Sequence, residues 1–306
     1  MTTTTLLARP SRTLVAAALT AVYLVWGSTY LAIRFALVSF PPFFQMGSRF
    51  MLAGALLMIF LKVRGQKLPN FQKESNLPWY WRNALIIGTL MLAGGMGLVG
   101  VASQTIGSGL IATFIAIVPM MVALIGLAFG KRPASLEVLG MLIGFGGVIL
   151  LLQGKSFNTS TVGLLAMFAA TLSWSIGSVL QTTKLPLAPG PMGFASEMLC
   201  GGAVLLAISL AVGEKISMPL NVQAVLAWGY LVVFGSLLAF SAYLFLLSNV
   251  SPALATSYAF VNPMIALFLG VCLGGEVVQE NEWLACSVIL FGVLMFFGSQ
   301  LKSVKK

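Results

Sequence analysis

Histidine is absent from this sequence, and charged residues are scarce. Only 8% of the 306 residues are charged, with 7 Asp or Glu against 17 Lys or Arg, whereas a soluble domain carries about 25%. The chain therefore lacks the commonest metal ligand and the usual base at neutral pH, and it has few acids from which to build a catalytic cluster. These absences argue against an intramembrane enzyme and predict no catalytic residue, no metal and no cofactor.

Motifs for disulfide, metal and nucleotide binding are also missing. Cys200, Cys272 and Cys286 lie in apolar runs without the CxxC or CxxxH spacing of a metal site, so we expect three small buried hydrophobic residues. No GxxxxGK followed by Ser or Thr is present, which argues against ATP as an energy source.

Long apolar runs dominate what is present. Hydrophobic residues make up 59% of the chain and the mean hydropathy is +1.00, which is more apolar surface than a globule of this length can bury. A helix needs about 20 apolar residues to cross the bilayer core. Ten such segments can be placed, at residues 13–35, 42–61, 83–102, 107–129, 134–152, 161–183, 190–212, 222–247, 252–274 and 281–300. The predicted fold is an all-α integral membrane protein.

The net charge of +10 is interpreted as topology information. If the N-terminus is cytoplasmic, thirteen Lys or Arg residues fall on the cytoplasmic side of ten crossings and only Arg34, Lys155 and Lys215 on the outer side. This bias predicts two cytoplasmic termini and is compatible with anionic lipid headgroups, so no nucleic-acid partner is needed. The first segment is long and ends without a small-residue cleavage site, which predicts a retained helix rather than a removed signal.

The first half of the chain is repeated in the second. At an offset of 148 residues, Trp26 pairs with Trp174, Pro41 with Pro189, Ser48 with Ser196 and Gly54 with Gly202, while Arg49 is replaced by Glu197. At an offset of 144, Leu110 pairs with Leu254, Pro119 with Pro263 and Gly126 with Gly270. We therefore predict two five-helix repeats, 13–152 and 161–300, between a cytoplasmic N-terminal tail (1–12) and a basic cytoplasmic C-terminal tail (301–306).

Each predicted repeat crosses the membrane five times, an odd number, so the two copies must enter it in opposite directions. Inverted repeats about an axis in the membrane plane are typical of secondary transporters, whose binding site lies near the midplane between the repeats. Some channels share the arrangement. A non-transporting scaffold or sensor is the alternative from another class, although it would have no need of an inverted cavity.

Three stretches of the sequence resemble those of a known family. They are W-G-S-T-Y at 26–30, P-P at 41–42 followed by R-F-x-x-A-G at 49–54, and S-P-A-L-A-T-S-Y-A-F-V-N-P at 251–263. Together they resemble the drug/metabolite transporter (DMT) superfamily, and more narrowly the EamA-type bacterial inner-membrane transporters, over residues 12–300. The resemblance implies ten helices, two inverted repeats, a central cavity lined mainly by helices 1, 3, 4, 6, 8 and 9, and export or exchange of small metabolites or drugs.

One position departs from the family pattern. Members often carry Gly-Glu after the fourth helix, as Gly275-Glu276 stands after the ninth, but here the fourth is followed by Gly130-Lys131. The departure leaves the role of this acidic position open.

Two charges, Arg49 and Glu197, lie well away from the ends of predicted helices. Arg49 follows Pro42 by seven residues and Glu197 follows Gly190 by seven, which places them about 10 Å from the outer and inner interfaces at 1.5 Å per residue. Charges at such depth are costly and usually face a polar interior or a partner. Arg49 is a candidate to bind a substrate carboxylate, and Glu197 to titrate or receive an amine. Alternatively, both are structural, with Arg49 extending to the interface or each bonding within its own half.

Matching faces of the first and sixth segments carry aromatic and polar residues. Trp26, Tyr30 and Arg34 follow one helix face with Thr29 beside them, and Trp174, Ser178 and Gln181 form the corresponding face. A deep Trp with neighbouring hydroxyls suits a cavity for an amphipathic or aromatic solute, although large aromatic residues also fill helix interfaces.

The ninth segment carries Tyr258 and Asn262 four residues apart, followed by Pro263. Pro119 and Pro263 each free a backbone carbonyl in mid-helix, so they are candidates for kinks that flex during transport or that only shape packing. Further candidate binding residues, which alternatively bond between helices, are Gln104, Ser241 and Tyr243.

Two remaining patterns predict structure. Segment ends carry four tryptophans expected at the membrane interfaces, namely Trp79, Trp81, Trp228 and Trp283. Close helix contacts, within a monomer or across a homodimer, are expected at the GxxxG pairs Gly126/Gly130, Gly140/Gly144 and Gly270/Gly274.

The sequence as a whole predicts a secondary transporter of the inner membrane that exports amino acids or related small amphipathic metabolites. Its expected partners are that solute and membrane lipid. Glu197 is the only acid in mid-segment and hence the candidate for proton coupling. The alternative within transport is a multidrug efflux protein.

Overall fold

The computed structural model describes residues 11–66, 68–69, 79–130, 133–153, 160–250, 252–255 and 257–303, and all regular structure in these ranges is helical, as predicted. The first half contains α1 (Arg12–Ala36), α2 (Pro42–Val63), α3 (Tyr80–Gly88), η1 (Thr89–Gly97), α4 (Leu98–Ala102), α5 (Ser108–Ile115), α6 (Val118–Gly126), η2 (Leu127–Phe129) and α7 (Ser135–Gln153). The second contains α8 (Thr161–Thr183), α9 (Pro191–Ala211), α10 (Val222–Tyr230), η3 (Leu231–Leu238), α11 (Ala239–Asn249), α12 (Pro252–Ala255), α13 (Tyr258–Gly274) and α14 (Glu280–Ser303).

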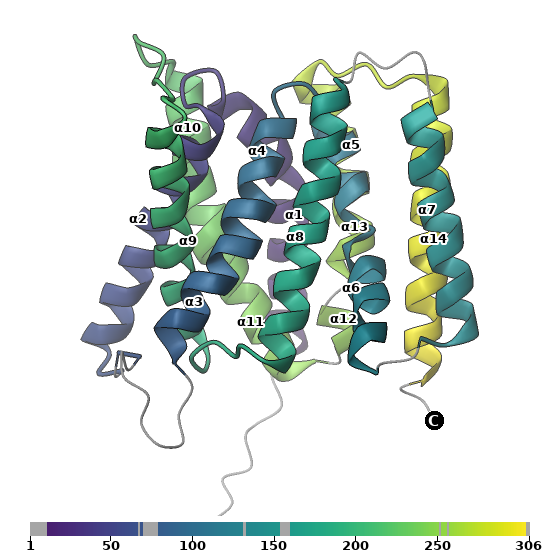
Figure 1. Cartoon of the computed structure of the whole chain (residues 1–306), viewed down its shortest axis with the longest axis horizontal. Coiled ribbons are helices and arrows are strands. Elements are labelled where there is room, and N and C mark those ends of the chain that lie inside the picture. Colours follow the sequence, from purple (N-terminus) through teal and green to yellow (C-terminus); the bar gives the residue numbers. More distant parts are fainter. Residues whose placement is uncertain are drawn as a thin grey trace, which may run out of the picture.

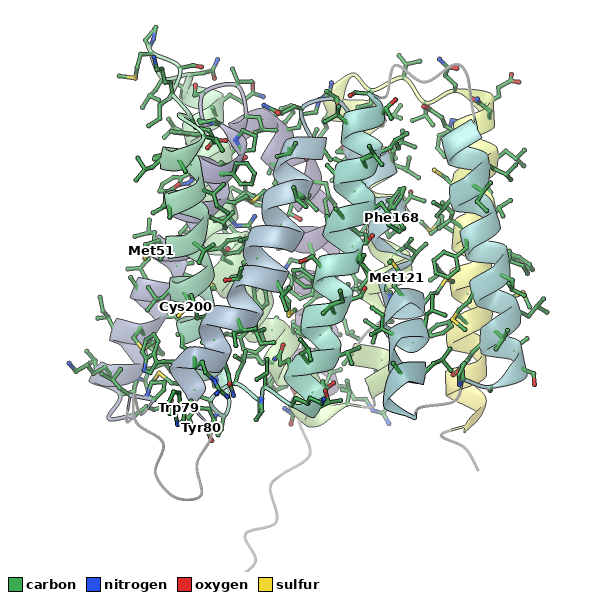
Figure 2. All side chains as sticks on the ribbon, in the orientation of Figure 1. Met51, Trp79, Tyr80, Met121, Phe168 and Cys200 are labelled. Carbon is green, nitrogen blue, oxygen red and sulfur yellow. The ribbon has the colours of Figure 1, made fainter. Side chains whose placement is uncertain are left out.

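These helices stand side by side as a bundle (Figure 1). Within the described ranges, 7 helical stretches are long and apolar enough to cross a membrane, and 135–150 and 261–272 form shorter apolar helices. Many large apolar side chains point outward, among them Phe168, which is 52% exposed on α8 (Figure 2). Exposure of this kind is expected where the surrounding solvent is lipid.

Local sequence signals fix many helix ends. Pro42 and Pro191 stand in the first turns of α2 and α9, where a missing N–H costs nothing. The Ser11 and Asn221 side chains accept hydrogen bonds from the first turns of α1 and α10. The starts of these four helices are therefore set by proline in the first turn or by Ser or Asn at the N-cap, all of which are visible in the sequence.

Gly130 ends η2 in the left-handed conformation, with φ 77°, which glycine adopts without strain. A Cβ added there would meet nothing within 4 Å. The prediction that Gly130 contributes to a close helix contact is therefore wrong, because this glycine is used for a helix end.

Two helices contain long π-helical segments that the sequence analysis did not predict. Between α3 and α4, η1 takes up 9 residues, and between α10 and α11, η3 takes up 8. Such segments widen a helix locally and are frequent at functional sites. Both occupy the third membrane-crossing stretch of their half.

Glycines set the closest helix pairs. A Cβ added at Gly54 would lie 3.0 Å from Cβ of Met198, and one at Gly202 would lie 2.8 Å from the backbone N of Met51. As the numbering rises along α2 it falls along α9, so these helices run antiparallel. The α7–α14 pair is formed in the same way, since a Cβ at Gly140 would lie 2.6 Å from the backbone N of Phe296.

The cysteines differ from one another in exposure. All three are free thiols: Cys286 is buried, Cys200 is half-buried and Cys272 is exposed. The expectation of a buried residue is wrong for Cys272, because α13 turns this position away from the bundle.

The predicted interface tryptophans lie near helix ends. Trp79 precedes α3 at the lower end of the bundle in Figure 2 and is 42% exposed. Trp283 is exposed in the first turns of α14. Trp228 is half-buried, and its indole N–H donates to the Ser48 hydroxyl at 3.0 Å, so it also joins α10 to α2.

Candidate functional site

A buried arginine lies where α2 meets the π-helical segment η3. Arg49 is only 3% exposed, and its Nε donates to the Ser236 hydroxyl at 2.8 Å. Its guanidinium lies 4.9 Å from the centre of the Phe50 ring. Its Nη1 is buried and has no hydrogen-bond partner among the residues that the structure describes.

The local backbone makes room for this guanidinium. A Cβ added at Gly235 would lie 3.1 Å from Arg49 Nη2 and 3.2 Å from the Thr29 methyl group. Glycine at this position of η3 therefore lets α1, α2 and η3 converge on one point. Thr29 is buried, but its hydroxyl donates to the carbonyl of Trp26 at 2.7 Å, so its donor is already used.

Trp26 extends the site toward α11 and α13. Its indole N–H donates to the Gly235 carbonyl at 3.2 Å, one residue from the serine that holds Arg49. Its ring lies 5.3, 5.2 and 4.8 Å from the centres of Phe240, Tyr243 and Tyr258. We call these four residues the aromatic cluster.

The polar edge of the aromatic cluster is the start of α13. Asn262 is buried, and its amide nitrogen donates to the carbonyls of Tyr23 and Tyr258, each at 3.3 Å, once the amide oxygen and nitrogen are exchanged. The hydroxyls of Tyr23 and Ser257 share a hydrogen bond of 2.5 Å. These bonds tie α1 to the chain between α12 and α13.

The structure therefore brings six of the predicted binding residues to one region around α1, α2 and η3, namely Trp26, Thr29, Arg49, Tyr243, Tyr258 and Asn262. Tyr30 belongs to the same region because it follows Thr29 on α1 and packs against the buried core that contains Phe50, the neighbour of Arg49. Seven of the ten predicted binding residues are thus neighbours in space.

Three predicted binding residues lie elsewhere. Trp174 packs against η1, where a Cβ added at Gly95 would lie 2.9 Å from its ring. The Ser178 hydroxyl donates to the Trp174 carbonyl at 2.8 Å. Gln104 is exposed in the turn between α4 and α5. Among the remaining candidates, Gln181 is half-buried near the end of α8 and Ser241 is exposed on α11.

Glu197 is isolated. It is 4% exposed on α9 and makes no hydrogen bond or ion pair with any residue that the structure describes. The backbone of α3 comes close to it, because a Cβ added at Gly88 would lie 2.8 Å from the Glu197 carbonyl oxygen. Arg49 and Glu197, although aligned in the repeat, do not form an ion pair.

The two predicted kink prolines have different surroundings. Helix α5 ends at Ile115, and Pro119 stands in the first turn of α6. Pro263 lies inside α13, which begins five residues earlier at Tyr258. The paired prolines therefore occupy different places in their helices, one in the first turn and the other in the interior.

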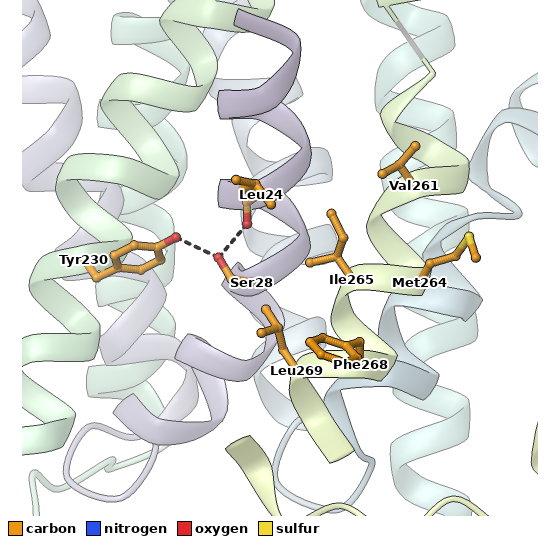
Figure 3. A pocket seen from close by; sticks show the side chains of 8 residues that line it. All are labelled: Leu24, Ser28, Tyr230, Val261, Met264, Ile265, Phe268 and Leu269. Atoms are coloured by element: carbon orange, nitrogen blue, oxygen red, sulfur yellow. Dashed lines mark hydrogen bonds between the residues drawn. The ribbon is translucent and has the colours of Figure 1, made fainter. Parts of the chain in front are cut away.

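Sequence reasoning missed Gly235, Ser236 and Phe240, as well as a lateral groove. This groove has a volume of about 520 Å³ and is lined by Leu24, Ser28, Tyr230, Val261, Met264, Ile265, Phe268 and Leu269 (Figure 3). On one side of it the Ser28 and Tyr230 hydroxyls lie 2.7 Å apart. No spacing in the sequence marks these residues, because they come from α1, α10 and α13.

Within the described ranges, no group of three or more His, Cys, Asp or Glu residues could hold a metal ion.

The chain is similar in sequence to known families of membrane transporters. The EamA-like transporter family matches the chain twice, at residues 13–153 and 161–298. YedA of Escherichia coli (strain K12), described as an uncharacterized inner membrane transporter, is 43% identical over 279 residues, covering 91% of this chain and 89% of YedA. The uncharacterized transporter sll0355 of Synechocystis is 28% identical over 298 residues, covering 90% and 88% of the two chains. A crystal structure of a protein 20% identical in sequence has a similar fold, with a TM-score of 0.64 over 97% of this chain and 100% of the other.

Proposed function

The chain belongs to the EamA-like transporter family, and on this premise we propose that it exports amino acids or related small amphipathic metabolites across the cytoplasmic membrane by alternating access. The observation that carries the proposal is Nη1 of buried Arg49, which has no hydrogen-bond partner in the described part of the chain. An unsatisfied buried donor costs roughly 1–3 kcal/mol, and more when it is charged. A solute carboxylate that accepts from Nη1 would remove this cost, so the site favours an anion-bearing ligand.

The surroundings of Arg49 support an amphipathic solute. Ser236 holds the guanidinium from one side, which fixes its orientation before a ligand arrives and lowers the entropy lost on binding. The aromatic cluster begins at Trp26, whose indole is bonded to the residue next to Ser236. Binding sites combine apolar walls with a few placed polar groups in this way. In this proposal Arg49 binds the carboxylate of the solute, while Trp26, Tyr243 and Tyr258 contact its apolar part.

The proposed architecture is ten crossings in two inverted five-helix repeats with both termini cytoplasmic. The reciprocal contact of α2 and α9 supports it. Gly54 lies against Met198 and Gly202 against Met51, and these positions correspond at or near the 148-residue offset. Two equivalent helices that meet antiparallel through equivalent residues are related by a two-fold axis across their contact. Such an axis, lying in the membrane plane, is typical of secondary transporters.

Export would then proceed by rocking one repeat against the other around the Arg49 site. The proposed coupling residue is Glu197, because a buried carboxylate without a partner is stable only when it is protonated or when a cation arrives. Pro119 and Pro263 are proposed as the positions where their helices flex. The solute gradient itself is the alternative energy source.

One observation favours a second candidate function, multidrug efflux. The groove of Figure 3 is apolar apart from the Ser28–Tyr230 hydroxyl pair, and its lining residues Met264 and Phe268 are exposed on the outside of the bundle. A lipophilic drug dissolved in the bilayer could enter by such a groove. Export of hydrophobic cations would favour this function, whereas a requirement for a carboxylate would favour the first.

The experiment that tests the proposal begins with the profile of metabolites released by cells that overproduce the protein. Released compounds are then assayed for counterflow in proteoliposomes with the wild type, Arg49→Lys and Arg64→Lys. Arg64 is an exposed arginine at the end of the same helix and serves as the matched control. We expect carboxylate-bearing solutes to be transported by the wild type and by Arg64→Lys, and to be lost in Arg49→Lys. The absence of flux for every solute would instead support a scaffold or sensor.

A further inference from the structure

Two glutamates from the second half of the chain cap helices of the first half at the same end of the bundle. Glu214, in the connection between α9 and α10, accepts hydrogen bonds from the backbone N–H groups of Phe43 at 3.0 Å and Phe44 at 2.8 Å. These are orphan donors in the first turn of α2. The same connection bonds to the turn after α1, where Ser217 N–H donates to the Ser39 carbonyl at 2.9 Å.

Glu276, in the connection between α13 and α14, does the same for α5. Its Oε1 accepts from Ser108 N–H at 2.7 Å and from Arg34 Nη1 at 2.8 Å, and its Oε2 accepts from Gly109 N–H at 3.3 Å. The carboxylate is 6% exposed. It therefore joins α1, α5 and the end of α13 in one charged group.

The backbone around Glu276 is shaped to admit this carboxylate. A Cβ added at Gly270 would lie 2.5 Å from Glu276 Oε2, and one at Gly107 would lie 2.9 Å from the same atom. Larger residues at either position would displace the side chain. Both connections that carry these glutamates lie at the upper end of the bundle in Figure 1, which we call the clasp end.

Among the residues that the structure describes, no glutamate joins the two halves at the opposite end in this way. The residue 148 positions before Glu214 is Gln66, and those aligned with the Gly275-Glu276 pair are the cations Lys131 and Arg132. In α9, the repeat equivalent of α2, the first-turn N–H of Gly193 donates to the backbone carbonyl of Gly190 at 3.2 Å rather than to a carboxylate. A bond between the halves that is present there joins neutral groups, since the Asn83 amide donates to the Pro186 carbonyl at 2.9 Å.

We propose that Glu214 and Glu276 form a pair of clasps that hold the two halves together at the clasp end, and that opening of this end during transport requires both to release. This inference rests on the proposed alternating access. Charge-assisted hydrogen bonds are about twice as strong as neutral ones, and a released carboxylate must be resolvated. Because the glutamates stand at the clasp end and the residues aligned with them are not acidic, the clasp end is the harder of the two ends to open. Glu276 thus acts as a positioning residue for the closed state.

The test uses accessibility of a reporter thiol at the candidate site. Thr29→Cys is made in a protein whose three native cysteines are replaced, and its labelling by a membrane-impermeant maleimide is timed in right-side-out and inside-out vesicles. Glu276→Ala and Glu214→Ala should each raise the labelling rate from the clasp end by about tenfold, the effect of losing one charge-assisted bond. Labelling from the opposite end should be unchanged or slower.

Glu137→Ala is the matched control. Glu137 also caps a helix, accepting from Ala134 N–H at 2.9 Å, but both residues belong to the first half. Its removal should leave labelling from both sides unchanged. Glu276→Gln keeps the shape and one acceptor oxygen, so it should give an intermediate rate, whereas a purely structural cap would show no side preference.

Two outcomes would overturn the proposal. The first is unchanged labelling in clasp variants that elute as a single folded species, and the second is an equal increase from both sides. Arg34→Ala, which removes only the half-exposed partner of Glu276, provides a milder variant should Glu276→Ala fail to fold. Counterflow measured on parallel vesicles that retain Thr29 separates the two claims, because flux with unchanged labelling refutes the clasps alone, whereas absent flux refutes the proposed function.

Discussion

At the scale of single residues, the defining feature is a guanidinium that the protein only partly satisfies. Arg49 bonds to Ser236 through Nε and leaves Nη1 buried and unpaired among the described residues. A purely structural arginine would be expected to use its donors, because a buried charge is stable only when it is well bonded. The geometry therefore favours the functional interpretation of Arg49 over the structural one.

The substitution Arg49→Met distinguishes the functional interpretation of Arg49 from the structural one. If Nη1 awaits a ligand, the apolar replacement should leave the free energy of unfolding unchanged or raise it by about 1 kcal/mol, because it removes an unsatisfied buried donor. Transport should be lost in the same variant. Thermal unfolding in detergent and counterflow provide the two readouts. A destabilisation of about 3 kcal/mol or more would instead make Arg49 a structural anchor.

Glu197 leads to a second prediction at this scale. Its carboxylate is buried without a bonded partner in the described part of the chain, so a proton or a cationic group must accompany any charge that it carries. Glu197→Gln should abolish the stimulation of efflux by an imposed pH gradient while solute exchange continues. Glu137→Gln, at an exposed helix cap, should retain the stimulation. An unchanged pH response in Glu197→Gln would exclude this residue from coupling.

At the scale of elements, the two π-helical segments position the tryptophans of the repeat. Trp26 of the first half meets Gly235 in η3, and Trp174 of the second half meets Gly95 in η1. Each π-helical segment thus receives the tryptophan of the opposite half. The two contacts differ in kind, because Trp26 donates a hydrogen bond to the Gly235 carbonyl, whereas the Trp174 ring packs against Gly95 where a side chain would otherwise lie.

A substitution in η1 tests this packing. Gly95→Ala would place a Cβ 2.9 Å from the Trp174 ring, and overpacking of this kind typically lowers the free energy of unfolding by about 1–3 kcal/mol. Gly229→Ala in α10 is the matched control, since a Cβ there meets nothing within 4 Å. It should raise the stability by about 0.4–1 kcal/mol through the unfolded state. Equal melting temperatures for both variants would contradict the packing argument.

Prediction of the elements succeeded where a local signal existed. The predicted segment 161–183 coincides with α8, and 42–61 differs from α2 by two residues. The π-helical segments had no such signal, because the run from Thr89 to Gly97 is as apolar and glycine-rich as many α-helices. Its hydrogen-bond register depends on what packs against it from the other half of the chain.

At the scale of the whole molecule, the α2–α9 and α7–α14 contacts bring the halves together in antiparallel pairs. The connections after α1, α9 and α13 meet at one end, where Ser39 bonds to Ser217 and Arg34 to Glu276. At the other end, Asn83 bonds to Pro186. Bonds between the two halves of the chain are therefore found at both ends of the bundle.

The orientation of these ends in the membrane is testable by labelling. Val277 is 88% exposed after α13, and Arg64 is exposed after α2. In a cysteine-free protein, Val277→Cys should react with an impermeant maleimide added outside the cell, and Arg64→Cys only after the membrane is opened. The bias of thirteen basic residues against three gives this direction. Reaction of both positions from one side would contradict the inverted arrangement.

The sequence by itself determined the membrane class, the internal repeat and many helix ends, because each depends on composition or on residues close together along the chain. Only the tertiary structure decided which partners meet: Arg49 with Ser236, 187 positions apart, and Glu276 with Ser108, 168 positions apart. Serine in an apolar run and glutamate in a loop have no local pattern that names a distant partner. Their roles arise when antiparallel packing of the two halves brings them together.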